Sequence, residues 1–248
     1  MTDPTPQPVF VLVRPQMGEN IGAAARAMAN FGLGRMRLVA PRDGWPNPKA
    51  VAMASGAGRL LDDAQVYDTT AEAIADCTCV YATTARPRGL IKSVVTPERA
   101  MAETAERLAA GGQVAVLFGP ERAGLENEDI ARATAIISVP VDPAFPSLNL
   151  AQCALLTAYE WRRQRVPATA KKMEFAGSEP ATGLEVEKLG DHYEERLGQA
   201  GFFFPEDKAA HMKQNLRNLW SRLPLTRADV QILHGVLRQM VRWKERGD

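Results

Sequence analysis

The sequence predicts an α/β protein with a mostly parallel sheet, followed by a small helical extension. Short apolar segments of strand length alternate with helical segments from residue 9 to residue 164. Three helical patterns then follow a stretch rich in Pro, Gly, Ser, Thr and Lys. We therefore expect a disordered tail over residues 1–8, an α/β domain over 9–164, a linker over 165–183 and a helical extension over 184–248.

The predicted strands are short apolar runs bounded by loops. Continuous apolar runs such as Val9–Val13 are typical of strands that are buried on both faces of a parallel sheet. The six predicted strands are Val9–Val13, Met36–Ala40, Gln65–Asp68, Thr78–Thr83, Gln113–Phe118 and Ala135–Val139.

The predicted helices are bounded by residues that start or stop a helix. Asn20 is expected to cap an alanine-rich helix that Gly32 ends, and Pro97 stands in the first turn of another helix. Those of the first domain are Asn20–Phe31, Pro48–Met53, Glu72–Asp76, Pro97–Ala110, Asn127–Ala131 and Leu150–Gln164. Those of the extension are Leu184–Gln199, Pro205–Arg222 and Arg227–Arg246.

The composition excludes several classes of protein. A formal net charge of +1 restricts any nucleic-acid surface to a local patch. Cys77, Cys79 and Cys153 have neither a disulfide framework nor zinc-ligand spacing, so we expect reduced thiols, no metal site and a cytoplasmic protein. No apolar run is long enough to span a membrane and no signal peptide is recognisable, so no membrane association is expected.

Three polar stretches are expected to form one site. They are Asn20–Met28 (NIGAAARAM), Phe118–Leu125 (FGPERAGL) and Phe145–Glu160 (FPSLNLAQCALLTAYE). Ligands of open α/β sheets bind beyond the carboxyl ends of the strands, where these stretches are predicted to lie. Taken singly, each also fits a structural role, as a surface arginine, a loop ion pair or a helix cap. The glycines match neither GxGxxG nor GxxxxGK[ST], so a conventional dinucleotide or P-loop site is not predicted.

A basic loop, Thr84–Lys92, follows another predicted strand. Its Arg86 and Arg88 can grip phosphate groups in a bidentate manner, although the loop also fits an ordinary solvated turn.

The three stretches, in this order and spacing, resemble the motifs of the SPOUT superfamily of RNA methyltransferases of the TrmH/SpoU type. The helical extension resembles that of the TrmJ-like group, whose members methylate the ribose 2′-hydroxyl at the 5′ side of the tRNA anticodon loop, on cytidine or uridine at nucleotide 32. The resemblance implies a trefoil knot at the end of the α/β domain, with S-adenosylmethionine bound in the knot. It also implies tRNA as the partner and a homodimer with the site at the subunit interface.

The resemblance also assigns roles to single residues. Arg26, Ser147, Glu121 and Asn149 would be catalytic, and Arg86 and Arg88 would bind RNA. The residues implied to contact the cofactor are Thr83, Thr84, Ala85, Gly119, Val139, Ser147 and Leu148. Two positions depart from the family pattern, since relatives often carry a basic residue at Pro120 and a small polar residue at Pro146.

A ribose hydroxyl must lose its proton to attack a methyl group. A guanidinium stays protonated in proteins, so Arg26 is expected to bind the adjacent phosphate and stabilise the developing alkoxide. Ser147 or that phosphate would relay the proton. The alternatives are a methyltransferase of the same superfamily that acts on ribosomal RNA, a non-catalytic RNA-binding dimer and a small-molecule nucleotide-binding protein.

Overall fold

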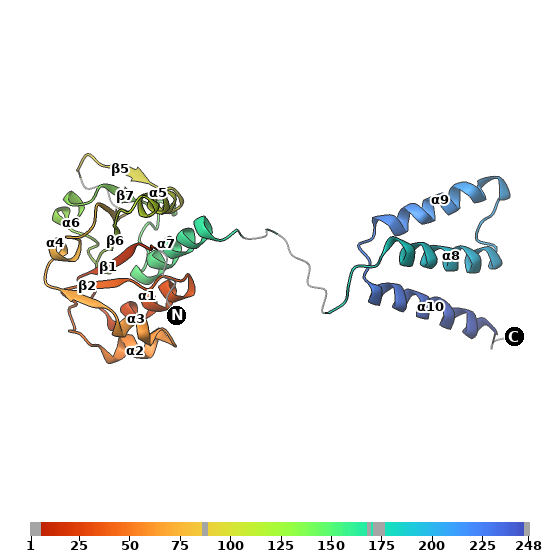
Figure 1. The fold of residues 1–248 in the computed structure, drawn as a ribbon, viewed down its shortest axis with the longest axis horizontal. Helices are drawn as coiled ribbons and strands as arrows, with labels where there is room; N and C mark the ends of the chain where they lie inside the picture. The colour runs from red at the N-terminus through yellow and green to blue at the C-terminus, as the bar shows by residue number, and fades with distance from the viewer. Residues whose placement is uncertain (1–5, 86–88, 168–169, 171–176, 246–248) are drawn as a thin grey trace. The chain divides into compact units, whose positions relative to one another are not determined.

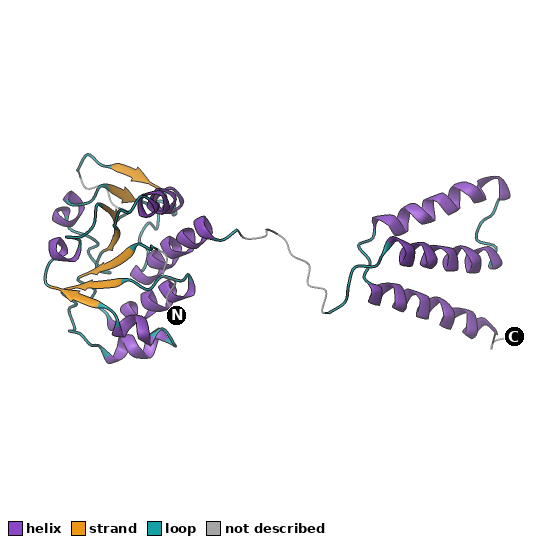
Figure 2. Cartoon of the chain, in the orientation of Figure 1, coloured by secondary structure: helices purple, strands orange, loops and turns teal. Residues whose placement is uncertain are grey.

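The computed structural model describes residues 6–85, 89–167, 170 and 177–245, and the side chains of residues 244 and 245 are left aside. The chain divides into two compact units, residues 1–168 and 169–248. Figure 2 shows strands and helices together in the first unit and helices in the second. The predicted residues Arg86 and Arg88 lie outside the described part of the chain.

The first unit is built on a parallel sheet of seven strands in the order β3-β2-β1-β6-β4-β7-β5. Phe10 lies opposite Met36 in the pairing of β1 with β2, and Tyr81 lies opposite Ala135 in the pairing of β4 with β7. The strands are β1 (Val9–Val13), β2 (Met36–Val39), β3 (Gln65–Tyr67), β4 (Cys79–Thr83), β5 (Ser93–Val95), β6 (Val114–Phe118) and β7 (Ala135–Ile137). The prediction of an α/β fold with a mostly parallel sheet is confirmed.

Helices cover both faces of this sheet (Figure 1). Alternate residues of a strand point to opposite faces, so Phe10 packs with the helices on one face and Val11 with those on the other. The first face carries α1 (Gly18–Asn30), α2 (Pro48–Ala54), α3 (Gly58–Asp62), α5 (Pro97–Ala109) and α7 (Leu150–Arg165). The second carries α4 (Thr70–Ala73) and α6 (Asn127–Ala131).

Some local predictions were wrong. Helix α1 begins at Gly18, and its N-cap residue Met17 makes no side-chain capping bond, so Asn20 is inside the helix and is not its cap. The predicted helix Glu72–Asp76 is shifted to Thr70–Ala73, because Thr69 and Glu72 form a capping box there. The strand β5 and the helix α3 were not predicted. Both are short, and β5 is an edge strand with exposed side chains, which leaves little apolar pattern to detect.

An ion pair between the buried Arg37 and the exposed Asp76 fixes β2 to the segment after α4. The Arg37 side chain donates to both carboxylate oxygens of Asp76, at 2.6 and 2.8 Å, and to the backbone oxygen of Ala73 at 2.7 Å. The hydrogen bond from Arg37 holds the pKa of the Asp76 carboxyl well below its usual range. This arginine is therefore paired within the sheet and is not available to a ligand.

The second unit contains α8 (Gly183–Gln199), α9 (Glu206–Arg222) and α10 (Arg227–Glu245). Leu189, Trp220 and Val230 form its buried centre. Arg217 of α9 pairs with three acids of α8, namely Glu187, Asp191 and Glu194. Among the described residues of both units, no helix is long and apolar enough to cross a membrane.

The backbones of α1 and α2 approach each other closely at Gly22. A Cβ atom built on Gly22 would stand 2.1 Å from the backbone oxygen of Ala50. Gly22→Ala must therefore push the two helices apart, and we expect it to lower the free energy of unfolding by about 1–3 kcal/mol, as overpacking does. Urea unfolding of the full chain measures this loss.

Gly58→Ala is the matched control, because nothing lies within 4 Å of a Cβ at this helix start. It should change the unfolding free energy by less than about 0.5 kcal/mol. Equal stabilities of the two variants would contradict the close contact at Gly22.

Candidate functional site

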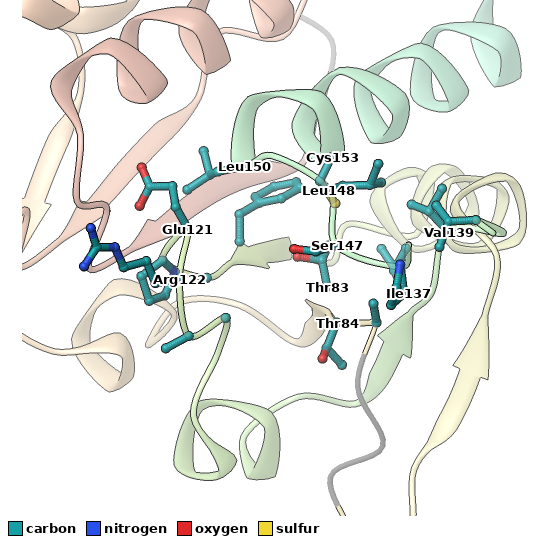
Figure 3. A pocket seen from close by; sticks show the side chains of 18 residues that line it. Thr83, Thr84, Glu121, Arg122, Ile137, Val139, Ser147, Leu148, Leu150 and Cys153 are labelled. Carbon is teal, nitrogen blue, oxygen red and sulfur yellow. The ribbon is translucent and has the colours of Figure 1, made fainter. Parts of the chain in front are cut away.

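The candidate site is a cavity at the carboxyl ends of three neighbouring strands, β6, β4 and β7. These strands end at Phe118, Thr83 and Ile137, so the loops that follow them leave the same edge of the sheet. The loop between β7 and α7 closes the cavity with Ser147 and Leu148. Figure 3 shows Glu121 and Arg122 on one side of this space and Ile137 and Val139 on the other. A ligand-binding edge of this kind is general for open α/β sheets.

All seven residues predicted to contact a cofactor line this cavity. They are Thr83, Thr84, Ala85, Gly119, Val139, Ser147 and Leu148. The two departures from the family pattern, Pro120 and Pro146, line it as well. The structure thus brings together residues from three loops that are far apart in the sequence, and their roles toward a ligand stay predictions.

The cavity floor has fixed polar groups and a neutral thiol. The Thr83 hydroxyl donates to the backbone oxygen of Leu117 at 2.8 Å, so its orientation is set by the sheet. Burial raises the pKa of the Cys153 thiol to about 11, against the opposing effect of a hydrogen bond with Thr83. The thiol is therefore protonated near neutral pH and serves as part of the wall, since only the thiolate is a strong nucleophile.

Gly119 allows the loop after β6 to fold back on itself. A Cβ atom at this position would lie 2.2 Å from the backbone nitrogen of Leu125 and 2.5 Å from the carbonyl carbon of Gly124. Gly124 has a φ of +67° and donates its N–H to the oxygen of Pro120 at 2.8 Å. The tight turn brings Glu121 to the wall of the cavity.

Asn20 joins the three predicted motifs. Its side-chain nitrogen donates to Glu121 Oε1 at 2.6 Å, and its side-chain oxygen accepts from the amide of Asn149 at 3.0 Å. Glu121 Oε2 also accepts the backbone N–H of Gln16 at 2.9 Å. The Asn149 side chain in turn accepts the N–H of Ala151 at 2.8 Å and so caps α7. One polar side chain from each motif, namely Asn20, Glu121 and Asn149, is thus part of one hydrogen-bonded chain.

Asn20 was not among the predicted site residues. Its position at the expected start of a helix favoured a capping role. Its contacts with segments more than 100 residues away were therefore not predicted. The only signal in the sequence is that the asparagine belongs to the first motif.

The structure does not bring Arg26 to the cavity. Arg26 is exposed on α1 and is absent from the residues that line the cavity. Of the four predicted catalytic residues, Glu121 and Ser147 line the cavity and Asn149 adjoins it, whereas Arg26 faces outward. A site made from one copy of the described chain therefore lacks this arginine.

Two family models match this chain. The SpoU rRNA methylase family matches residues 7–159, and the C-terminal domain of the tRNA methyltransferase TrmJ matches residues 184–248. The first match contains the whole cavity, and the second covers the helices of the second unit.

Similar proteins match along nearly the full chain. The tRNA (cytidine/uridine/adenosine-2′-O-)-methyltransferase TrmJ of Pseudomonas aeruginosa is 39% identical over 92% of this chain and 91% of its own length. The tRNA (cytidine/uridine-2′-O-)-methyltransferase TrmJ of Klebsiella pneumoniae is 34% identical, over 92% and 93%. The crystal structure of TrmJ from Z. mobilis is similar with a TM-score of 0.82 at 50% identity, over 94% of this chain and 99% of that one.

The link through Asn20 can be measured by a double-mutant cycle. Asn20→Ala leaves the Glu121 carboxylate without its side-chain donor, and a hydrogen bond to a charged group contributes about 1.5–3 kcal/mol. We expect Asn20→Ala and Glu121→Ala to be coupled by about 1 kcal/mol or more in urea unfolding.

Arg122→Ala is the control for this cycle, because Arg122 is exposed beside Glu121. Its effect should add to that of Asn20→Ala within about 0.5 kcal/mol. If the effects of Asn20→Ala and Glu121→Ala on the unfolding free energy simply add, the hydrogen bond between these two side chains is not formed.

Proposed function

Since this chain belongs to the SpoU methylase family of SPOUT methyltransferases and carries the TrmJ C-terminal domain, we propose that it methylates a ribose 2′-hydroxyl of tRNA. The observation that carries the proposal is the match to TrmJ enzymes over both units, including the helices beyond the methylase domain. The substrate would be cytidine or uridine at the 5′ side of the anticodon loop, nucleotide 32, in the cytoplasm. The domains would extend over residues 9–164 and 184–248, joined by the linker 165–183.

The methyl donor we propose is S-adenosylmethionine, which supplies an electrophilic methyl group on a sulfonium. The residues that line the cavity suit S-adenosylmethionine, because they combine apolar side chains with hydroxyl groups and with backbone groups at the strand ends. Ile137, Val139 and Leu148 provide apolar surface for a flat heteroaromatic ring. Thr84, Gly119 and Ser147 would hold its polar parts. We further propose that the segment from β6 to α7 forms the trefoil knot of this family.

The residues of this chain have to position the ribose and stabilise charge. A guanidinium keeps its proton, so Arg26 binds the phosphate next to the target ribose and stabilises the alkoxide as the 2′-hydroxyl loses its proton. Ser147, in the cavity wall, takes up that proton and passes its own hydroxyl proton to solvent water.

Glu121 and Asn149 act as positioning residues in this mechanism. The Glu121 carboxylate already accepts two hydrogen bonds, from Asn20 and from the backbone of Gln16. The Asn149 amide group is likewise shared between Asn20 and the start of α7. Both residues therefore hold the loops in place, and the proton transfer is left to Ser147.

The exposed position of Arg26 supports a homodimer. One copy of the chain has no described arginine from α1 in its cavity, so we propose that the partner copy supplies Arg26. Helix α7 follows the cavity and exposes Leu155, Leu156 and Tyr159, an apolar surface suited to a subunit interface. Arg86 and Arg88 would hold tRNA phosphates beside the site.

Methyl transfer to defined RNAs tests the function. Purified protein with radiolabelled S-adenosylmethionine should label tRNA and leave ribosomal RNA unlabelled, and nucleotide mapping should find one modified ribose. A tRNA with a 2′-deoxy sugar at that nucleotide should accept no methyl group, because the nucleophile is absent. Labelling of ribosomal RNA alone would favour the rival substrate, and no labelling with intact cofactor binding would favour a non-catalytic RNA-binding dimer.

Mixing two inactive variants tests the shared site. Arg26→Ala and Ser147→Ala should each lose at least about 100-fold in kcat, as the removal of a charge-stabilising or proton-transfer group does. If Arg26 acts on the partner's cavity, a heterodimer of the two variants has one intact site, so denatured and refolded mixtures should regain about a quarter of wild-type activity. Mixtures that stay inactive while heterodimers form would place Arg26 in the cavity of its own chain.

A further inference from the structure

Phe145 is an aromatic side chain left in solvent at the edge of the cavity. It is 78% exposed, and it directly precedes Pro146 and Ser147, which both line the cavity. Phe145 itself is not a lining residue. Burial of a phenylalanine ring is favourable, so an exposed ring beside a ligand site favours a partner that covers it.

The backbone around Phe145 is ordered by a local turn. The Phe145 N–H donates to the backbone oxygen of Asp142 at 2.9 Å, and the Ala144 N–H donates to the Asp142 carboxylate at 2.8 Å. Pro143 and Pro146 on either side restrict φ. The ring is therefore presented by a preorganised loop, which lowers the entropy cost of binding to it.

Among the described residues of the first unit, a second exposed aromatic ring, that of Tyr159, already contacts other side chains. Among the described residues, Tyr159 is 46% exposed, packs edge-on against Phe31 with ring centroids 5.8 Å apart, and lies under the Arg163 guanidinium. Phe145 has no such aromatic or cationic neighbour in the described part of the chain. Its ring face is free for a flat ligand.

We propose that Phe145 stacks on the base of the nucleotide whose ribose is methylated, an inference that rests on the proposed function. A 2′-hydroxyl can enter the cavity near Ser147 only if its nucleotide leaves the base stack of the RNA loop. Unstacked bases in RNA-binding proteins stack on aromatic side chains. The base is one glycosidic bond from the ribose, so a ribose held at Ser147 brings its base to the rim where Phe145 stands.

The stacking has a consequence for base choice. Every base has a π-face, so an aromatic platform binds bases with little regard to sequence. Phe145 would thus fix the orientation of the target nucleotide without selecting its identity, and its removal should weaken methylation of different target bases to a similar extent.

The experiment is a double-mutant cycle between the protein and the RNA. Phe145→Ala should lower kcat/KM for tRNA by about 10- to 100-fold, since base–aromatic stacking is worth about 1–3 kcal/mol per base. Phe145→Trp should stay within about threefold of wild type, and Phe145→Leu should fall toward the alanine variant. An abasic target nucleotide should weaken the wild-type reaction by a similar factor, and combining it with Phe145→Ala should cause no further loss.

Several outcomes would overturn the proposal. They are an unchanged kcat/KM for Phe145→Ala, full activity of Phe145→Leu, and losses that multiply when the variant meets the abasic RNA. Dissociation of the Phe145→Ala dimer in light scattering would instead assign the ring to the subunit interface. Val51→Ala, which removes another exposed apolar side chain on α2, should leave kcat/KM unchanged.

The proposal and the proposed function fail in different ways. Absence of methyl transfer by the wild-type protein would remove the proposed function itself. Normal wild-type transfer with any of the contrary Phe145 results would remove only the stacking role. Calorimetry with S-adenosylmethionine should give the same affinity for the wild type and Phe145→Ala, because the ring is not part of the cavity lining.

Discussion

The site depends on a single side-chain amide, that of Asn20. An amide group both donates and accepts, so Asn20 can hold the Glu121 carboxylate on one side and the Asn149 amide on the other. A carboxylate at this position could accept from Asn149 but could not donate to Glu121. Helix α1, the loop after β6 and the start of α7 thereby take fixed positions around the cavity, although no strand pairing connects them.

This polar link is effective because the apolar framework behind it is rigid. The sheet is buried on both faces, and its central strands end at one edge, so the loops start from well-defined points. Gly22 and Gly119 allow backbones to approach more closely than any side chain would permit. Packing thus sets where the loops around the cavity begin, and the hydrogen bonds of Asn20 then hold these loops in one arrangement.

The arrangement also separates binding from chemistry. The cavity of one copy contains the residues suited to hold a methyl donor, while Arg26 is exposed on α1 and does not line it. In the proposed dimer, activity requires two folded copies, and the exposed apolar side chains of α7 provide a surface for their contact. The rim residue Phe145 extends the same division, since it would act on the base whereas the cavity acts on the ribose and the cofactor.

The sequence by itself determined the fold class and most elements to within two residues, because apolar runs and helix-starting residues are local patterns, and its motifs indicated seven of the residues that line the cavity through their resemblance to a known family. Strands such as Val9–Val13 and helices such as Asn127–Ala131 have the predicted bounds. Only the tertiary structure decided what Asn20 contacts, that Arg26 faces outward, and that β5 pairs with β7 as an edge strand. These facts depend on contacts between segments that are distant in the chain. The residues next to Asn20 in the sequence, for example, are compatible both with a helix cap and with a residue of the site.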